Sequence, residues 1–402
     1  MDSLRILNTG DWRLTSACEG IPYYPENLVK PLASSTQASI ERLIDFAVED
    51  LVDVVVVGGN TIDPTSAGPA DFAFLLHQLK RLEQSAIPVI WNWSWLDQRN
   101  QWPKCFKWPS NVRQVIGDTP QTITLNLGPK GRVTFIGVEL TSAQQISPSW
   151  FDGLKLEGLA FGVAYGAVTD QVSNISPQIN WLVSGNSYGK ESHDNGVHLY
   201  YSGSPQGRSL KESGPHGAAL LEYHDNGEID FQFINTSKVE YESITIDING
   251  ISTPDSLAVT AIEHLAKRTF DQSIVYVIEL ELAGANYHIH SLPFVEIYND
   301  FRASLQESLT KLSPNLILSR LAPLPTEEDL HSYEEEVLGE FLFITRELKE
   351  EGWASLNLDQ KLPSQETGNW SKLLDDLSGL RTILSAESLG KHLLGISEKD
   401  AA

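Results

Sequence analysis

The first ninety residues alternate between short apolar runs and segments with helical spacing. Residues 53–57 include four consecutive valines, which is typical of a strand buried on both faces of a sheet. Before this run, apolar residues between positions 40 and 51 recur every three or four residues, with Ser35 and Thr36 as candidate caps. The order strand, helix, strand predicts a parallel α/β sheet. The expected elements are strands 4–9, 53–57 and 87–90 and helices 40–51 and 72–82.

Beyond residue 120 the strand signals follow one another more closely. From Val197 onward they are separated by turn signals such as Asp225-Asn226-Gly227, which indicates antiparallel hairpins. A strand, a helix beginning at Thr253-Pro254 and another strand then predict a small α+β cap domain. Further strands are expected at 121–127, 132–140, 158–165, 180–184, 198–201, 218–223, 228–234, 242–248 and 273–282.

The pattern becomes helical after about Pro293. The segment Leu321–Pro325 is expected to be a linker, and residues 332–350 form a strongly amphipathic pattern. We therefore predict three regions. They are a layered α/β sandwich over residues 1–236, an α+β cap over 237–295 and a helical C-terminal tail over 296–402.

Composition narrows the classes of function. The chain has 402 residues, of which 41% are apolar, and a formal net charge of −24. A strongly negative protein is repelled by the phosphate backbone of a nucleic acid. Unselective binding to that backbone is therefore not expected, because its affinity comes mostly from lysine and arginine side chains. We expect no membrane segment, and with only Cys18 and Cys105 we expect unreactive thiols, no cysteine-based zinc site and a cytoplasmic location.

Several short motifs stand in a distinctive order. They are Gly-Asp-Trp-Arg-Leu at 10–14, Gly-Gly-Asn-Thr-Ile-Asp at 58–63, Ile-Pro-Val at 87–89, Trp-Leu-Val-Ser-Gly-Asn at 181–186 and a long motif from Tyr201 to Gly217 that contains Gly-Ser-Pro. In this order the motifs resemble the SbcD-type DNA repair nuclease subunit, which belongs to the calcineurin-like metallophosphoesterases. The resemblance covers roughly the first 290 residues, and the tail matches in architecture only.

This resemblance implies a fold, a chemistry and partners. The family folds as a layered calcineurin-like metallophosphoesterase sandwich and hydrolyses phosphodiesters with two divalent ions, manganese being the expected metal. The family also implies an SbcC-type ATPase, related to the SMC proteins, that docks on the late helices. Dimerisation through the phosphoesterase domain and contact with DNA through the complex are implied as well.

Most of the family's metal ligands are replaced in this chain. Asp11 is retained, whereas Arg13 stands where the first motif, Asp-x-His, has its histidine, and Asn60 stands where the family's Gly-Asp motif has the metal-bridging aspartate. Arginine cannot ligate a cation and repels one. The remaining degenerate positions are Trp95 for the asparagine ligand, Leu96 for the catalytic histidine, the retained Asp97, and Tyr165, Asn186 and Tyr188 for three histidine ligands.

We therefore expect a retained scaffold without nuclease activity and without a cofactor. In this interpretation Arg13 pairs with Asp11, and large side chains fill the space of the metal cluster. The alternative is an active exonuclease or phosphoesterase with a reduced or relocated metal site. The residues of a reduced site would be Asp11, Asn60, Asp63 and Asp97.

Other groups have a simple structural interpretation beside a functional one. His193, Asp194 and His198 could form a relocated metal site, but a polar loop is favoured. His288 and His290 alternate as on an ordinary strand. The tryptophans 91, 93 and 95 could stack on nucleobases, although core packing is favoured, and Lys104 and Lys107 with Trp102 and Trp108 give the one basic aromatic segment.

Overall fold

The computed structural model describes residues 3–21, 25–143, 146, 148–151, 154, 156, 158–166, 179–185, 190–194, 197–284, 289, 292 and 297–324. These residues form two compact units. The first unit is built mainly from residues 25–240 together with 3–19, and the second from residues 241–272 and 276–324. Among the described residues, no helix is both long enough and apolar enough to cross a lipid bilayer.

The first unit contains two six-stranded sheets. The first sheet has the strand order β12-β11-β1-β2-β3-β4. The pairs β1–β2, β2–β3 and β3–β4 are parallel, whereas β11 is antiparallel to both β1 and β12. Its strands are β1 (Leu4–Thr9), β2 (Val54–Val57), β3 (Val89–Trp91), β4 (Val112–Gln114), β11 (Gly217–Tyr223) and β12 (Ile229–Asn235).

The second sheet has the strand order β5-β6-β7-β8-β10-β9. Its four central strands run parallel to one another, and the two edge strands, β5 and β9, are antiparallel to their neighbours. The strands are β5 (Gln121–Asn126), β6 (Arg132–Gly137), β7 (Leu159–Tyr165), β8 (Ile179–Ser184), β9 (Lys190–Asp194) and β10 (Val197–Tyr201).

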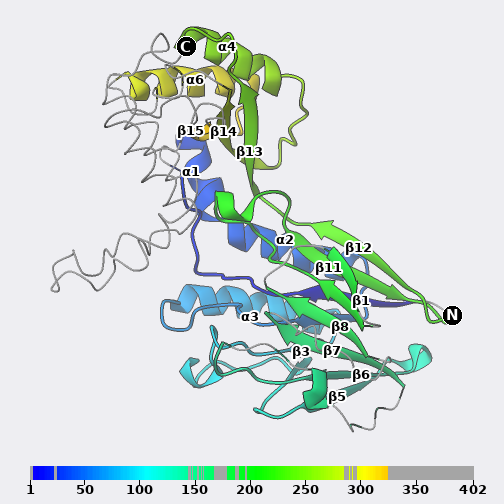
Figure 1. The fold of residues 1–402 in the computed structure, drawn as a ribbon. Coiled ribbons are helices and arrows are strands. Elements are labelled where there is room, and N and C mark those ends of the chain that lie inside the picture. The colour runs from blue at the N-terminus through cyan, green and yellow to red at the C-terminus, as the bar shows by residue number, and fades with distance from the viewer. Residues whose placement is uncertain are drawn as a thin grey trace, which may run out of the picture. The chain divides into compact units, whose positions relative to one another are not determined.

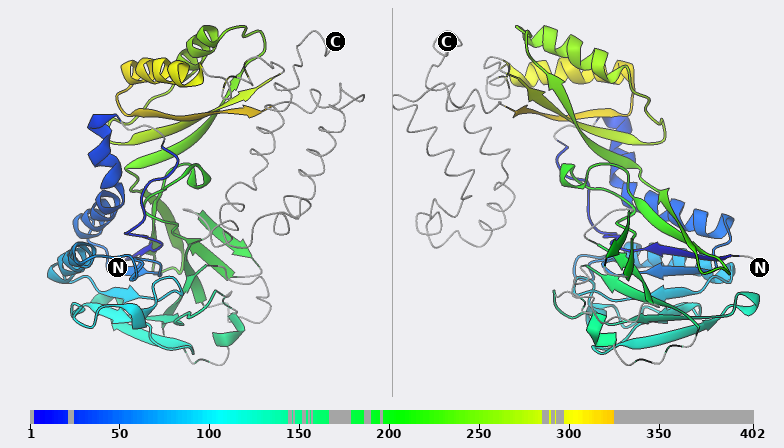
Figure 2. Two further views of the ribbon diagram at one scale, coloured as in Figure 1. Left: turned by 90° about the vertical axis from the view of Figure 1, so that its left-hand side faces the viewer. Right: turned by 45° about the vertical axis from the view of Figure 1, so that its right-hand side comes forward.

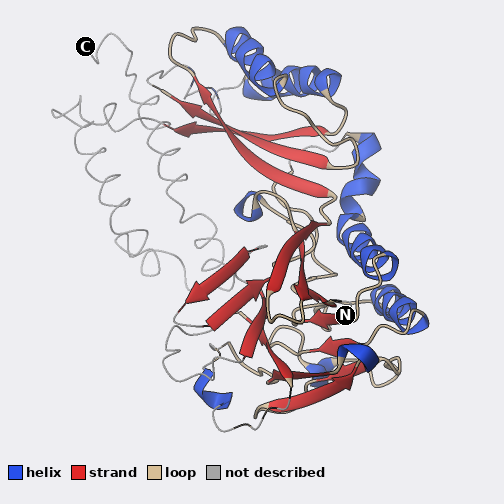
Figure 3. Cartoon of the chain, turned by 90° about the vertical axis from the view of Figure 1, so that its right-hand side faces the viewer, coloured by secondary structure: helices blue, strands red, loops and turns tan. Residues whose placement is uncertain are grey.

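The two sheets pack face to face as an α/β sandwich. Alternate valines of β2 point to opposite sides, because successive side chains of a strand alternate. Val54 and Val56 join the core between the sheets with Phe135 and Phe161, whereas Val55 and its neighbours on that side pack under the helices. The strand is thus buried on both faces, and the expected α/β sandwich is confirmed (Figure 3).

Helices α1 (Glu26–Ala33), α2 (Ser35–Glu49) and α3 (Pro69–Gln84) belong to the first unit (Figure 1). In α3 the first turn starts with Pro69, and Asp71 accepts a hydrogen bond from the Gly68 backbone N–H at 2.9 Å, which caps the helix. Buried residues of α2 and α3 at helical spacing, such as Leu43 and Leu79, cover the outer face of the first sheet.

The described residues of the second unit form a three-stranded sheet and two helices. Strands β13 (Val239–Asp247), β14 (Val275–Ala283) and β15 (Leu316–Leu324) lie in that order, and β15 runs parallel to β14. Figure 2 shows helices α4 (Pro254–Leu265) and α6 (Tyr298–Leu312) side by side on one face of this sheet. Thr253 caps α4 by accepting a hydrogen bond from the Ser256 backbone N–H at 3.2 Å.

Several expectations need correction. The segment expected to be a linker at Leu321–Pro325 lies largely within β15, because its apolar residues complete the sheet of the second unit. The sheet therefore continues beyond the expected boundary at residue 295. Ser35 and Thr36 are not caps but the first helical residues of α2, whose N-cap is Ser34. Helix α1 and the short strands β4 and β9 were not predicted, and the amphipathic pattern at 332–350 lies outside the described residues.

Candidate functional site

The candidate site lies where parallel strands of the two sheets end. The loops after β1, β2 and β3 carry Asp11, Asn60 and Trp95, and Tyr165 is the last residue of β7. Close approach of these ends requires glycine. A Cβ atom on Gly58 would lie 1.9 Å from the Oγ of Ser184 at the end of β8. The carboxyl ends of parallel strands are where α/β folds collect ligands, and here they bring Asp11, Asn60, Trp95 and Tyr165 together.

Two loops at this site are joined by their backbones. The N–H of Asp11 donates to the Gly59 carbonyl at 2.8 Å, and the N–H of Arg13 donates to the Asn60 carbonyl at 3.0 Å. Asp11, Arg13 and Asn60 all have left-handed backbone, with φ of 51°, 43° and 51°. Such a conformation costs about 1–2 kcal/mol for an ordinary L-residue such as arginine. It persists only when the surrounding contacts fix the loop, and such residues cluster at functional sites.

Asp11 is held on one side by neutral groups. Its Oδ1 atom accepts hydrogen bonds from the Asn60 amide at 2.5 Å and from the Tyr165 hydroxyl at 3.1 Å. The same amide also donates to the Tyr165 oxygen at 3.0 Å. Asp11 is only 8% exposed, so water does not reach most of its carboxylate. The Asn60 and Tyr165 donors supply the hydrogen bonds that water would give an exposed carboxylate.

Arg13 holds Asp11 on the other side. One terminal nitrogen of its guanidinium lies 3.1 Å from Asp11 Oδ2, and the other donates to Glu212 Oε1 at 2.6 Å. Glu212 also accepts a hydrogen bond from the Arg208 backbone N–H at 3.0 Å, and the Arg208 guanidinium lies 3.8 Å away. Two carboxylates thus face two guanidinium groups, and the charges balance without any further ion.

The pKa shifts follow from this packing. Burial, with the nearby Asp11 charge adding to it, raises the pKa of the Tyr165 hydroxyl, so the phenol keeps its proton and donates. Burial lowers the pKa of Arg208 to about 10, which leaves it charged at neutral pH. Burial opposes ionisation of Glu212, but the Arg13 hydrogen bond and charge outweigh it and hold the Glu212 pKa below its ordinary value. Glu212 and Arg208 are therefore both charged around neutral pH.

Large apolar groups occupy the rest of the site. The Trp95 ring packs edge-on against the Tyr165 ring, with centroids 5.0 Å apart. Trp95 also lies over Gly166, where a Cβ would come within 3.2 Å of its ring. Leu96 is 45% exposed and offers no ligand atom at the position where the family has its catalytic histidine. The aromatic pair fills space beside the Asp11 carboxylate.

Asp97 and Asp63 are committed to other contacts. Asp97 is buried, and its two oxygens accept four hydrogen bonds from the backbone and hydroxyl groups of Ser94 and Thr61. Burial raises the pKa of Asp97, and these donors act against that shift. Asp63 accepts from Thr65 and Ser66 in its own turn. The structure therefore brings Asp11 and Asn60 together but gives Asp97 and Asp63 structural roles in the loops.

Three residues of the site were missed by sequence reasoning. Glu212 and Arg208 complete the charge network, and His216 supports their loop. The His216 Nδ1 lies 3.0 Å from the Ser204 hydroxyl, and its Nε2 lies 3.0 Å from the Glu212 carbonyl oxygen. All of them belong to the long motif that ends at Gly217, so the signal was present, but the pairing of Glu212 with Arg13 joins positions 199 residues apart.

The remaining candidates are aromatic, basic, cysteine and histidine side chains, and some of them lie outside the described residues. Trp91 and Trp93 are fully buried among aromatic rings of the core, which confirms packing as their role. Lys104 and Lys107 are exposed on a loop. Cys105 is exposed, and the Cys18 sulfur lies 3.4 Å from the Ser35 hydroxyl. His193 and His198 are opposite each other in the β9–β10 register. Asn186, Tyr188, His288 and His290 lie outside the described residues.

Comparison with known proteins adds one relative. No protein-family model matches the chain. Over 291 residues the chain is 23% identical to the uncharacterized metallophosphoesterase YhaO of Bacillus subtilis (strain 168), covering 68% of this chain and 69% of that protein. The chain is thus similar to a metallophosphoesterase over about two thirds of its length. Among solved structures, a dimetal phosphatase from Danio rerio matches 59% of this chain and 97% of that one, with a TM-score of 0.37 and 10% identity.

Metallophosphoesterases use metal ions, but the residues present here do not fit a dimetal centre. Two divalent ions about 3.5–4 Å apart need carboxylate, amide and imidazole ligands from several loops. Among the described residues of the strand-end loops, Asp11 faces the site with its carboxylate, and its oxygens already contact Asn60, Tyr165 and Arg13. Among the described residues, a group with metal-ligand spacing occurs elsewhere, at Glu222, His224 and Asp230.

Proposed function

We propose that this chain is a metallophosphoesterase-like subunit that works by binding rather than by phosphodiester cleavage. One observation carries the proposal. The guanidinium of Arg13 lies between Asp11 and Glu212, where the retained carboxylate would otherwise face a metal ion. A cation supplied by the chain itself leaves neither charge nor ligand atoms for two divalent ions.

The energetics favour such a closed site. A carboxylate that is only 8% exposed and lacks a partner is costly, because desolvation disfavours its charged form. Arg13, the Asn60 amide and the Tyr165 hydroxyl satisfy Asp11 without metal. Backbone hydrogen bonds join the left-handed loops to each other. The chain's own donors therefore satisfy this site, as the proposal requires.

Metal content and cleavage test the proposal directly. The purified full-length protein is analysed for bound metal and assayed for manganese-dependent cleavage of linear DNA and of a simple phosphodiester. An intact SbcD-type nuclease serves as the positive control. We expect neither stoichiometric metal at the Asp11 site nor cleavage, and Asp11→Asn should leave the metal content unchanged.

Cleavage that requires manganese and is lost in Asp11→Asn would overturn the proposal. It would instead establish the alternative, an exonuclease or phosphoesterase with a reduced site. Cleavage that survives in Asp11→Asn and copurifies with a different protein on further fractionation would identify a contaminating nuclease, and the proposal would stand.

We further propose that the partner is an SbcC-type ATPase and that DNA is contacted through that complex. Support comes from the motif resemblance of the first 290 residues and from the apolar stripe at 332–350, since an amphipathic helix docks into a groove through such a stripe. The formal net charge of −24 agrees with a subunit that does not grip DNA by itself.

Copurification with the ATPase tests this partnership. The double variant Leu338→Glu/Leu342→Glu places charges on the apolar stripe, whereas Glu340→Gln changes the charge of the same segment without touching the stripe. We expect the double variant to lose the ATPase and Glu340→Gln to retain it. Equal retention by both variants would show that the stripe does not dock the partner, and failure of wild type to bind would refute the partnership itself.

A further inference from the structure

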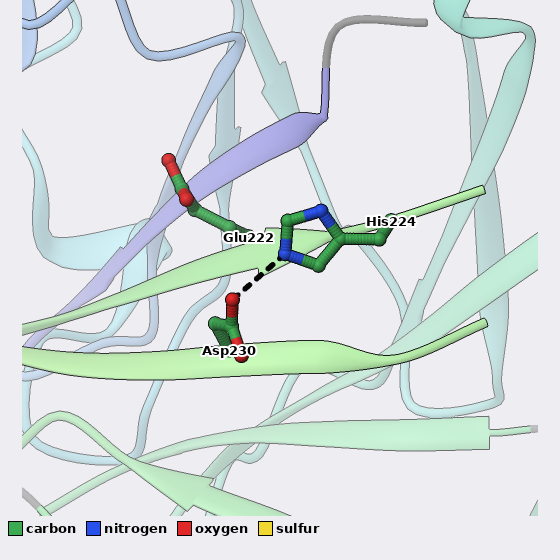
Figure 4. A group of neighbouring side chains, drawn as sticks. All are labelled: Glu222, His224 and Asp230. Carbon is green, nitrogen blue, oxygen red and sulfur yellow. Dashed lines mark hydrogen bonds and ion pairs between the residues drawn. The ribbon is translucent and has the colours of Figure 1, made fainter. Parts of the chain in front are cut away.

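A second group of polar side chains lies on the hairpin formed by β11 and β12. Glu222 and His224 are two residues apart near the end of β11, so their side chains share one face of the strand. Asp230 is the direct cross-strand partner of Glu222. Figure 4 shows the three side chains together over the two strands. This group lies at the opposite end of β1 from Asp11, since Glu222 is paired with Arg5 and Ala219 with Asn8.

The spacing of these side chains matches that of metal ligands. One ligand atom from each residue lies within 4.8 Å of the other two. Two atoms that bind one zinc ion at about 2.1 Å lie at most about 4.2 Å apart, so small side-chain rotations would close the group around an ion. The Nε2 of His224 is already 2.8 Å from Asp230 Oδ2, and the Asp230 side chain is 77% exposed and free to rotate.

The backbone under the group is rigid. Seven consecutive residue pairs join β11 to β12, from Gly217 opposite Asn235 to Tyr223 opposite Ile229. The turn is closed by a hydrogen bond from the His224 backbone N–H to the Glu228 carbonyl at 2.9 Å. Ligands on paired strands keep their spacing, so the ordering cost of binding falls mainly on side chains.

The electrostatic surroundings favour a cation. The segment 222–230 contains four carboxylates and no lysine or arginine. One cation lies nearby, because Arg5 Nε is 2.6 Å from Glu222 Oε1. A carboxylate has a second oxygen, and a metal-binding carboxylate is normally oriented by such an outer contact. Arg5 also forms an ion pair with Asp50, and this second carboxylate partly neutralises the positive charge that Arg5 places beside Glu222.

We propose that Glu222, His224 and Asp230 form a surface binding site for a zinc-like divalent transition-metal ion. One imidazole and two carboxylates suit zinc and its neighbours, whereas magnesium and calcium prefer oxygen ligands alone. Water would complete the coordination on the open side. The site is independent of the Asp11 network and of the proposed partner-binding function.

Zinc titration of the full-length protein tests the site. Zinc binding is measured by calorimetry and by equilibrium dialysis for wild type, His224→Ala and Asp230→Asn, with His77→Ala as a matched control for an exposed histidine on α3. We expect wild type and His77→Ala to bind one more equivalent of zinc than His224→Ala. Asp230→Asn should weaken that equivalent at least about tenfold, as loss of supporting groups at metal sites commonly does.

The variants change exposed or half-exposed side chains, and circular dichroism verifies that they fold. Magnesium at the same concentration should not displace the zinc. The proposal fails if His224→Ala binds as much zinc as wild type, or if His77→Ala loses the same equivalent. It also fails if magnesium competes equally, because an oxygen-only surface would then account for the binding.

Discussion

Replacing Arg13 with methionine would remove the cation of the candidate site while keeping a long apolar stem. The change leaves Asp11 without a guanidinium and leaves Glu212 with Arg208 alone, at side-chain exposures of 11% and 15% for the two carboxylates. Removing one partner of a fully buried pair costs about 3–5 kcal/mol, whereas exposed pairs contribute about 0.2–1 kcal/mol. Arg13 itself is 24% exposed, so we expect an intermediate cost of about 2 kcal/mol.

Thermal unfolding of the full-length protein measures this cost. For a unit of this size, about 2 kcal/mol corresponds to a fall in Tm of about 4–8 °C. Arg99→Met is the matched control, since Arg99 pairs with Glu139 at 3.2 Å but is 46% exposed. The control should lose less than about 1 kcal/mol. In the His224→Ala background, which lacks the proposed zinc site, EDTA should not change the Tm if the Asp11 network needs no metal.

A double variant separates the ion pair from packing. Arg13→Met/Glu212→Gln removes one of the two carboxylates that the single change deprives of Arg13, which relieves their mutual repulsion, so it should recover part of the lost Tm. The reasoning is refuted if Arg13→Met unfolds within 1 °C of Arg99→Met, or if adding Glu212→Gln lowers the Tm further. The first result would mean that the Arg13 charge contributes little to stability, and the second that Glu212 is stabilised by partners other than Arg13.

Three further predictions concern the same unit. Burial lowers the pKa of His216, so the free energy of unfolding should be highest above about pH 6.5 and should fall as the pH drops further, by up to about 1.4 kcal/mol per pH unit. Chemical denaturation at pH 7.5 and 5.5 should show a smaller fall in this free energy for His216→Gln than for wild type. Gly58→Ala places a Cβ 1.9 Å from Ser184 Oγ and should cost about 1–3 kcal/mol, partly recovered by adding Ser184→Gly, as thermal unfolding would show. Arg13→His/Asn60→Asp should not gain manganese-dependent DNA cleavage, since Trp95, Leu96 and Tyr165 still stand at other ligand positions. Measurable cleavage would contradict the conclusion that too many ligand positions are replaced for two substitutions to restore the site.

Strand positions in the first unit were largely predictable. The four valines of β2 predicted a strand buried on both faces, and their side chains do divide between the inter-sheet core and the helix-covered core. Apolar runs and turn residues encode such strands locally, because side-chain alternation and turn chemistry act over a few residues. Strand β4 and helix α1 are short, and α1 contains Pro31, so neither gave a clear periodic signal.

The segment Leu321–Pro325 could not be assigned correctly from local sequence alone. A Pro-containing apolar segment is typical of a linker, yet it forms most of the end of β15 because β14 offers a free parallel edge. That edge exists only in the folded sheet. The sequence motif likewise suggested that Arg13 pairs with Asp11, but it could not reveal Glu212 as the second partner.

The amino-acid sequence by itself determined which ligand types are available at the strand ends. Arg13 and Leu96 offer no ligand atom for a metal ion, and Tyr165 is a poor substitute for imidazole. The tertiary structure decided how the remaining charges are used. It brings Arg13 and Glu212 together across 199 residues, commits Asp97 to four loop donors, and aligns Glu222 with Asp230 on one hairpin face. Donor chemistry belongs to each side chain, whereas the distance between charges depends on strand pairing and packing.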